Sequence, residues 1–244
     1  MRDREAHHGR LRGYNGRYTV GNGRYTSSVP AKRQPPLPVR ERLLDAVDHL
    51  LFVEGVIATP VDDILKLAEA SPPSLYKHFG SKDGLITAAL ERRLAVWTRY
   101  WDEAMEQAGT QLERVLSVWP ALRAYQTTSL EERWCAFSGT TAAIKDKSEE
   151  LTAVLEAETR LLRTRTAALV DELGLAPRAS ARLTNELVIA YLGTMAMMLR
   201  EPYLHAIDDG EATARSLLQA ALTRADGPAR DLVDELVAAG QASR

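Results

Sequence analysis

The stretch 59–85 constrains the fold of this chain more than any other, because helix start and stop signals follow one another closely in it. Thr59 suits a helix N-cap, Pro60 suits the first helical position, and Asp62 completes a capping box. Apolar residues then recur at helical spacing, at Val61, Ile64, Leu65 and Ala68. We therefore predict a first short helix here.

A second short helix is predicted directly after the first. Ser71 suits its N-cap and Gly80 its end. Its buried side would be Leu75 and Phe79, and it carries no acidic side chain. Ser81 can then cap a third helix, which is long. Two short helices joined by a tight turn, the second of them basic, are typical of a helix-turn-helix.

The rest of the chain also has helical periodicity and no sustained period-two alternation, which predicts an all-α fold. An amphipathic helix over 39–54 would cover the two short helices and complete a three-helix DNA-binding unit. A helix over 82–107 would lead into a second domain. Five further helices are predicted there, the first kinked or split by Pro120: 110–127, 130–146, 148–173, 177–204 and 209–225.

Charge is unevenly distributed along the 244 residues. The net charge is −2, yet residues 1–42 carry ten basic and three acidic side chains. This basic end either faces an anion or is a solvated tail. Residues 1–37 have few aliphatic side chains and repeat Asn-Gly-Arg-Tyr-Thr, and we predict a disordered basic arm. The arm either contacts DNA or is an extension without a specific contact.

Several classes of protein are disfavoured. The single cysteine, Cys135, cannot form an internal disulfide, which fits a reducing, cytoplasmic location. No apolar run is long enough to span a membrane, and no secretory signal is recognisable. The motifs HExxH, CxxC, GxSxG and a phosphate-binding glycine loop are absent. We therefore expect no enzyme, and predict no catalytic residue, metal or cofactor.

One motif within the helix-turn-helix resembles a known family. The pattern Ser-x-x-Ser-Leu-Tyr-x-His-Phe-x-Ser-Lys-x-x-Leu, from Ser71 to Leu85, is similar to that of the TetR family of bacterial transcriptional regulators. The specific resemblance covers roughly 39–86. It implies a homodimer whose two recognition helices enter successive major grooves of an operator in double-stranded DNA. It also implies that the protein binds a small-molecule effector and acts as a repressor, the commonest role in this family.

The resemblance also implies roles for particular side chains. Pro72, Pro73, Ser74 and Lys77 would approach base edges, while Tyr76 and Lys82 would hold phosphates. His78 would either pack or contact a phosphate. The complete predicted DNA-binding set is Thr59, Ser71, Pro72, Pro73, Ser74, Tyr76, Lys77, His78 and Lys82.

Two departures from the family pattern lie at this site. Glu69 stands where a glycine is common, so the turn should be strained or differently shaped. Pro72 and Pro73 remove two backbone N–H groups from the start of the recognition helix. These departures favour an alternative, a helical dimeric adaptor that no longer binds DNA specifically.

The resemblance divides the chain into an arm (1–37), a helix-turn-helix domain (38–84), a helical ligand-binding and dimerisation domain (85–227) and a tail (228–244). The helix over 177–204 is apolar on more than one face, which favours a dimer contact. Aromatic and sulfur side chains could line an apolar ligand pocket or form an ordinary core. The predicted ligand residues are Trp97, Trp101, Met105, Trp119, Tyr125, Trp134, Phe137, Tyr191 and Met195.

Overall fold

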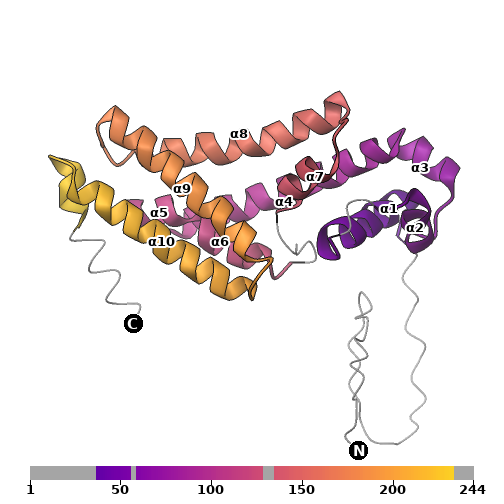
Figure 1. The fold of residues 1–244 in the computed structure, drawn as a ribbon, viewed down its shortest axis with the longest axis horizontal. Helices are drawn as coiled ribbons and strands as arrows, with labels where there is room; N and C mark the ends of the chain where they lie inside the picture. The colour runs from indigo at the N-terminus through magenta and orange to yellow at the C-terminus, as the bar shows by residue number, and fades with distance from the viewer. Residues whose placement is uncertain (1–36, 56–58, 129–134, 234–244) are drawn as a thin grey trace, which may run out of the picture. The chain divides into compact units, whose positions relative to one another are not determined.

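The computed structural model describes residues 37–55, 59–128 and 135–233, which form helices and no strand (Figure 1). The predicted all-α class is confirmed. Apart from Leu37, the predicted arm lies outside the described residues, as does the tail beyond residue 233. In chain order the helices are α1 (Val39–Val47), η1 (Asp48–Val53), α2 (Val61–Leu67), α3 (Pro72–Phe79), α4 (Lys82–Gln107), α5 (Gln111–Leu116), α6 (Val118–Tyr125), α7 (Ala136–Ala143), α8 (Glu149–Asp171), α9 (Pro177–Met197) and α10 (Tyr203–Thr223).

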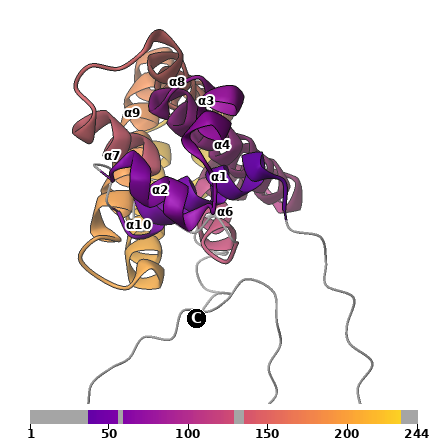
Figure 2. The ribbon, with the colours of Figure 1, turned by 90° about the vertical axis from the view of Figure 1, so that its right-hand side faces the viewer.

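The first helices form the predicted three-helix unit. α1 packs against α2 and α3, and the start of α4 packs against α1 and α3 (Figure 2). α1 continues directly into η1, a π-helical segment that carries the predicted helix to Val53. The buried side chains of this unit include Leu43, Val47, Ile64, Leu75 and Leu85. Each short helix buries its apolar face only through the others, so the helix-turn-helix depends on this joint core.

α4 connects the three-helix unit to the bundle of helices that follows it, α5 to α10, which we call the second domain. Its bounds match the predicted range 82–107, and the hydroxyl of Ser81 caps it by accepting a hydrogen bond from the amide of Gly84 at 2.9 Å. Leu85 in its first turn is buried in the core of the three-helix unit, and Trp101 is buried in the second domain. One continuous helix therefore joins the two domains (Figure 1).

The second domain is a layered helical bundle. α9 packs between α8 and α10, and α6 packs between α4 and α10 (Figure 1). The predicted helix 110–127 is split at Ser117 into α5 and α6. Pro120 explains the split, because it has no N–H to donate to the carbonyl of Leu116 and its ring crowds that carbonyl.

The helix boundaries near residue 200 differ from the prediction. α9 ends at Met197 rather than at 204, and α10 begins at Tyr203 rather than at 209. Pro202, which the prediction placed inside the first of the two helices, is the N-cap residue of α10. Residues 205–208, which lay between the two predicted helices, are inside α10.

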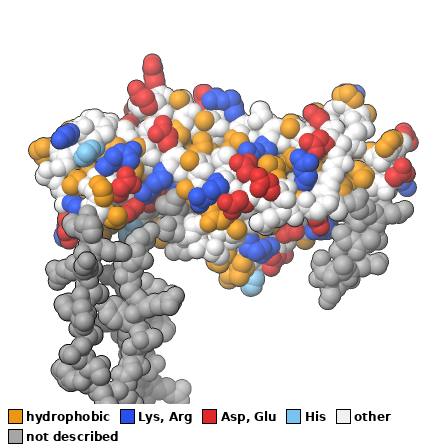
Figure 3. Space-filling model, turned by 180° about the vertical axis from the view of Figure 1, so that it is seen from behind, with side chains coloured by type: hydrophobic (Ala, Val, Ile, Leu, Met, Phe, Trp, Pro, Cys, Tyr) orange, Lys and Arg blue, Asp and Glu red, His pale blue; other side chains and the backbone are white. Residues whose placement is uncertain are grey.

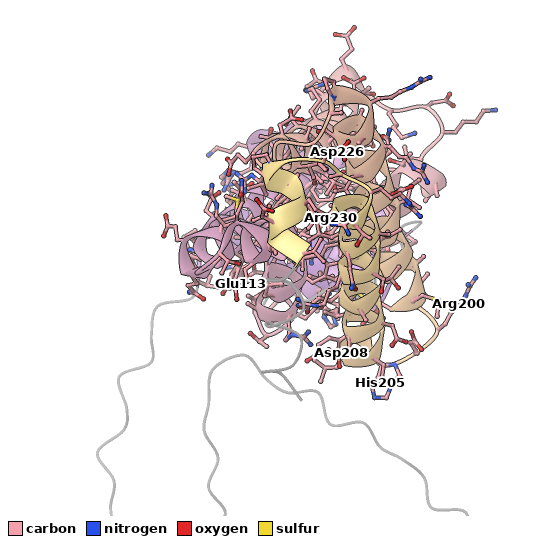
Figure 4. The ribbon with its side chains drawn as sticks, turned by 90° about the vertical axis from the view of Figure 1, so that its left-hand side faces the viewer. Glu113, Arg200, His205, Asp208, Asp226 and Arg230 are labelled. Atoms are coloured by element: carbon pink, nitrogen blue, oxygen red, sulfur yellow. The ribbon has the colours of Figure 1, made fainter. Side chains whose placement is uncertain are left out.

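Asp208 lies within α10, where it contacts a charged side chain of α6. Arg123 of α6 donates to Asp208 Oδ1 at 2.8 Å and to Glu211 Oε2 at 3.3 Å. Asp208 and His205 lie near one end of α10, and Asp226 and Arg230 lie near the other (Figure 4). The acidic residues of this segment therefore face a partner on α6 and do not form a polar loop.

Gly210 is tolerated within α10 because the helix backbone passes very close to its neighbours there. A Cβ atom at Gly210 would lie 1.9 Å from Thr194 Oγ1 and 2.8 Å from Trp119 Nε1. These two side chains form a buried hydrogen bond of 3.2 Å between α6 and α9. The close approach that glycine permits outweighs its low helix propensity.

Two negative findings concern the described part of the chain. It holds no helix that is both long and apolar enough to cross a membrane. Nor does it group three or more His, Cys, Asp or Glu side chains so that they could hold a metal ion.

Gly210→Ala is expected to lower the free energy of unfolding by about 1–3 kcal/mol, because its methyl group would overpack the contact with α6 and α9. Thr213→Ala, at an exposed position of α10, is the matched control and should change it by less than about 0.5 kcal/mol. Urea unfolding followed by circular dichroism measures both. Unchanged stability of Gly210→Ala would contradict this packing.

Candidate functional site

α3 has one side in the protein core and the other side in solvent. Leu75 is 1% exposed, and Phe79 packs partly buried against the same core. The guanidinium of Arg40 lies over the Phe79 ring at 5.5 Å. Gly80 has a φ angle of 72° and ends the helix, as predicted. These contacts hold the outer face of α3 in a defined orientation.

The N-terminus of α3 offers no backbone amide to a ligand. Pro72 and Pro73 have no N–H, and the amides of Ser74 and Leu75 donate to the carbonyl of Ser71. Ser71 is the N-cap residue, but its hydroxyl pairs with the Ser74 hydroxyl at 3.0 Å and caps no amide. Any phosphate at this helix must therefore be held by side chains and not by the backbone.

Most of the predicted DNA-binding residues lie together on this helix. Tyr76 is 59% exposed, and Lys77 and His78 are exposed beside it. At the start of α3, Pro72 and Pro73 are exposed. The members of the predicted set that the structure brings together are Ser71, Pro72, Pro73, Ser74, Tyr76, Lys77 and His78.

Two further members of the predicted set, Thr59 and Lys82, lie outside α3. Thr59 is 3% exposed, so its side chain is not presented to a DNA duplex. The N-cap residue of α2 is Pro60, and no side chain caps the helix there, so the predicted capping box with Asp62 is wrong. The backbone at Pro60 is still extended, which starts the helix one residue later. Lys82 Nζ donates to the carbonyl of Thr59 at 2.7 Å and ties this segment to α4.

The turn between α2 and α3 is strained, as the sequence predicted. Glu69 has a φ angle of 48°, a left-handed conformation that costs a non-glycine residue roughly 1–2 kcal/mol. Arg42 of α1 holds this turn by donating from Nε to the carbonyl of Ala68 at 2.8 Å and from Nη2 to that of Glu69 at 3.0 Å. A third bond joins Arg42 to the carbonyl of Leu37 at 3.1 Å.

Comparison with known sequences supports this site. The sequence profile of the tetR family of bacterial regulatory proteins matches residues 43–89, from α1 into α4. The HTH-type transcriptional regulator QacR of Staphylococcus aureus is 28% identical over 76 residues, which are 31% of this chain and 40% of that regulator. The chain thus spans about two fifths of the length of this relative.

Solved structures extend the similarity to the second domain. SCO4454, a TetR-family transcriptional regulator of Streptomyces coelicolor, has a TM-score of 0.66 and 19% identity, covering 75% of this chain and 95% of that chain. The tetr-transcriptional regulator sav143 of Streptomyces avermitilis has a TM-score of 0.60 and 25% identity, covering 76% of this chain and 98% of that chain. The helix-turn-helix of this chain therefore matches the TetR family in sequence, and the fold of the described chain is that of solved TetR-family regulators.

A buried ion network joins the three-helix unit to the middle of α4. Asp48 of η1 is 3% exposed, and its carboxylate oxygens accept hydrogen bonds from Arg92 and Arg93. Arg92 also donates to Asp45 Oδ1 at 2.8 Å. The guanidinium of Arg93, which is fully buried, lies over the ring of Phe52 at 4.6 Å. η1 and α4 are therefore held together by charge as well as by apolar packing.

The same network reaches the second domain. Arg93 Nη1 donates to the hydroxyl of Tyr125 in α6 at 3.2 Å. Tyr125 packs edge-on against Trp97 of α4, and Trp97 stacks on Tyr191 of α9, with ring centroids 5.8 Å and 6.0 Å apart. A continuous series of contacts therefore runs from η1 through α4 and α6 to α9.

The side chains predicted to bind a ligand form the core of the second domain. The indole N–H groups of Trp101 and Trp119 donate to Ser117 and Thr194. Met105 is half-buried, and Trp134 lies outside the described residues. The other members are all buried: Trp97, Trp101, Trp119, Tyr125, Phe137, Tyr191 and Met195. They pack as an ordinary core, the alternative that the sequence left open, and their ligand role stays a prediction.

The buried pair of Asp48 and Arg93 was not predicted from the sequence, because charged residues on amphipathic helices usually face solvent. A signal was nevertheless present. Asp48 lies four residues after Leu44 and three before Leu51, within the apolar stripe of its helix. Arg93 lies four residues before Trp97, within the apolar stripe of α4. Opposite charges in two apolar stripes indicate a buried pair.

Arg42→Ala is expected to lower the free energy of unfolding by about 1–3 kcal/mol, because the carbonyls of the strained turn lose a charged donor. Arg40→Ala removes the same charge from the same helix, at a more exposed side chain, and should cost less than about 1 kcal/mol. Urea unfolding of the two variants distinguishes them. Equal losses would show that Arg42 does not hold the turn.

Proposed function

We propose that this chain is a DNA-binding transcriptional regulator, a repressor that a small apolar or amphipathic ligand releases from its operator. The outer face of α3 supports DNA binding most directly. Tyr76, Lys77 and His78 are exposed there, on the second helix of a helix-turn-helix that matches the TetR profile. Such a helix enters the major groove with its N-terminal residues toward base edges.

The exposed side chains of α3 suit two kinds of contact. The hydroxyl of Tyr76 can donate to a phosphate, which sets the register on the duplex without selecting a sequence. Lys77 and the apolar rings of Pro72 and Pro73 are suited to the groove, where proline can contact thymine methyl groups. Lys82 keeps two further N–H donors for a phosphate after its bond to Thr59.

Attraction to DNA is expected to be local to α3. The net charge of the whole chain is −2. On the face drawn in Figure 3, acidic and basic side chains are interspersed rather than gathered by sign. Among the described residues, the side chains of the recognition helix are therefore expected to contribute most to DNA affinity, and single substitutions there should be informative.

Operator binding by this fold needs two recognition helices about 34–36 Å apart, and we assign the pairing of two copies to α9. Its inner face is buried at Tyr191, whereas Ile189 is 68% exposed on the outer face. A Cβ atom at Gly193 would have no neighbour within 4 Å, so a second helix could approach closely. Further exposed apolar side chains lie at the end of α9, at Met197, and beyond it, at Leu199, Tyr203 and Leu204.

Ligand response requires a connection between the second domain and α3. The hydrogen bond of Arg93 to Tyr125 and the ion pair of Arg93 with Asp48 supply one along α4. A ligand that binds one arrangement of α4 and α6 more tightly shifts the dimer toward it and changes the separation of the two α3 helices.

The second candidate function is a helical dimeric adaptor without specific DNA binding. The start of α3 favours it, because Pro72 and Pro73 leave this helix without N-terminal amide donors. The two functions differ in one observable. The adaptor would be a folded dimer that binds operator and unrelated DNA with the same affinity.

DNA binding can be tested by fluorescence anisotropy with the DNA upstream of the chain's own gene. Tyr76→Phe should weaken binding to all sequences about fivefold, because one hydrogen bond to a phosphate is lost. Lys77→Ala should cost about 1–3 kcal/mol and relax the preference at the base pairs it contacts. Lys145→Ala, which removes the same charge from the loop after α7, should bind like wild type. Unchanged affinity and salt dependence of both α3 variants would refute the assigned interface.

Ile189→Arg is expected to convert the dimer to monomers, because it places a charge in the apolar contact. Ala153→Arg introduces the same side chain on the exposed side of α8 and should leave the dimer intact. Sedimentation velocity measures both, and circular dichroism confirms that each variant is folded. A persistent Ile189→Arg dimer would place the interface elsewhere.

A further inference from the structure

A groove lies between α7, α8 and α9, apart from the buried aromatic core. Its volume is ≈ 320 Å³, which suits a small organic molecule. Buried apolar side chains form its floor: Phe137, Leu155, Leu162 and Val188. Of the predicted ligand residues, Phe137 lines it.

Glu158 of α8 lines this apolar groove. Burial raises the pKa of the Glu158 carboxyl to about 7, and a hydrogen bond from the Thr159 hydroxyl, 3.4 Å from a carboxylate oxygen of Glu158, opposes this only in part. A carboxyl group in such a place is disfavoured as an anion unless a cation accompanies it.

The two arginines around the groove are directed to other partners. Arg163 also lines the groove, but its Nη1 donates to Asn185 Oδ1 at 3.2 Å. Arg160, beside a neighbouring hollow, pairs with Glu156 at 3.2 Å, and Lys147 lines that hollow too. The groove-lining residues of α7 and α9 carry no charge. Glu158 therefore has no cationic partner among the described residues.

We propose that this groove binds an organic cation with an apolar body, and that the Glu158 carboxylate holds its cationic group. The apolar floor receives the body of the ligand, and the Thr159 hydroxyl orients the carboxylate. This proposal names the ligand class of the proposed regulator and so rests on that function for its biological meaning. Binding itself can be measured without DNA.

The groove is linked to α4 through α8. Arg165, two turns beyond Glu158, pairs with Asp102 of α4 at 2.8 Å. Its guanidinium lies over the Trp101 ring at 4.9 Å. A ligand that shifts α8 against α7 and α9 would therefore act on the second half of α4, whose first half packs against α3.

The test uses three probes with the same indole body but different charge. Tryptamine is a cation, tryptophol is neutral and indole-3-acetate is an anion at neutral pH. Titrations of the full chain are followed by ligand-observed NMR. At pH 8 tryptamine should bind roughly tenfold more tightly than tryptophol, because it gains a charge-assisted hydrogen bond, and indole-3-acetate should bind most weakly.

The pH dependence has a definite sign. Below about pH 7 the Glu158 carboxyl takes up a proton, so the affinity for tryptamine should fall toward that of tryptophol as the pH is lowered to 5. The affinity for tryptophol should stay nearly constant over this range. Bound tryptamine in turn lowers the pKa of Glu158 and releases a proton near pH 7.

Glu158→Gln should abolish both the preference for the cation and its pH dependence. This variant is expected to fold, because it removes a carboxyl that must be charged in an apolar site at high pH. Since the folded-state pKa of Glu158 is raised, wild type should lose thermal stability relative to Glu158→Gln as the pH rises from about 4.5 to 7. Glu156→Gln, at an exposed glutamate two residues away, is the matched control and should retain the preference.

Failure of this site can be distinguished from failure of the proposed function. No binding of tryptamine, equal binding of the three probes, or an unchanged preference in Glu158→Gln would each overturn the groove proposal, even if the chain binds its operator. Tryptamine binding that requires Glu158 but leaves operator affinity unchanged would uphold the site and contradict ligand-controlled release by this class of ligand.

Discussion

The buried carboxylate of Asp48 is the contact on which the relation between the two domains depends. It is 3% exposed and lies between Arg92 and Arg93. Separating a buried charge from its partner costs roughly 3–5 kcal/mol, so η1 cannot slide along α4 at low cost. The three-helix unit and the first half of α4 should therefore move as one body. Arg93 also bonds to Tyr125, which places this body under the influence of α6.

The helix-turn-helix departs from ordinary sequence preferences at two neighbouring places, and each departure has a local physical counterpart. The left-handed backbone at Glu69 is held by Arg42, whose fork-shaped guanidinium reaches two consecutive carbonyls of the turn. Pro73 removes one of the two amides that a serine cap could satisfy, the amide of Ser74 donates to the Ser71 carbonyl, and the Ser71 hydroxyl pairs with that of Ser74 instead. The exposed start of α3 is thus apolar, while positive charge comes later in the helix. The start of α3 is therefore suited to apolar contact with bases, and the later part of the helix to contact with negatively charged groups of DNA.

Helix existence was predictable wherever apolar periodicity ran for several turns, as in α4 and α8. The prediction of helix boundaries failed where a boundary depended on a single residue. The predicted start of α10 at 209 was six residues too late, and Gly210, a residue of low helix propensity, lies within the helix because it permits a close contact with Thr194 and Trp119. Thr59 predicted a cap, but it is buried and Pro60 occupies that position. In both cases packing against distant residues outweighed a local preference.

The amino-acid pattern alone was enough to predict the all-α fold, the helix-turn-helix and the long connecting helix, and the family resemblance indicated a strained or differently shaped turn at Glu69. Each of these depends on residues close together in the chain, whose spacing sets the periodicity and whose types set the backbone conformation. The burial of Asp48 between two arginines, the packing of the tryptophans as core and the position of Glu158 in an apolar groove needed the folded chain. Burial and pairing are properties of residues far apart in sequence, and they exist only once the helices have packed.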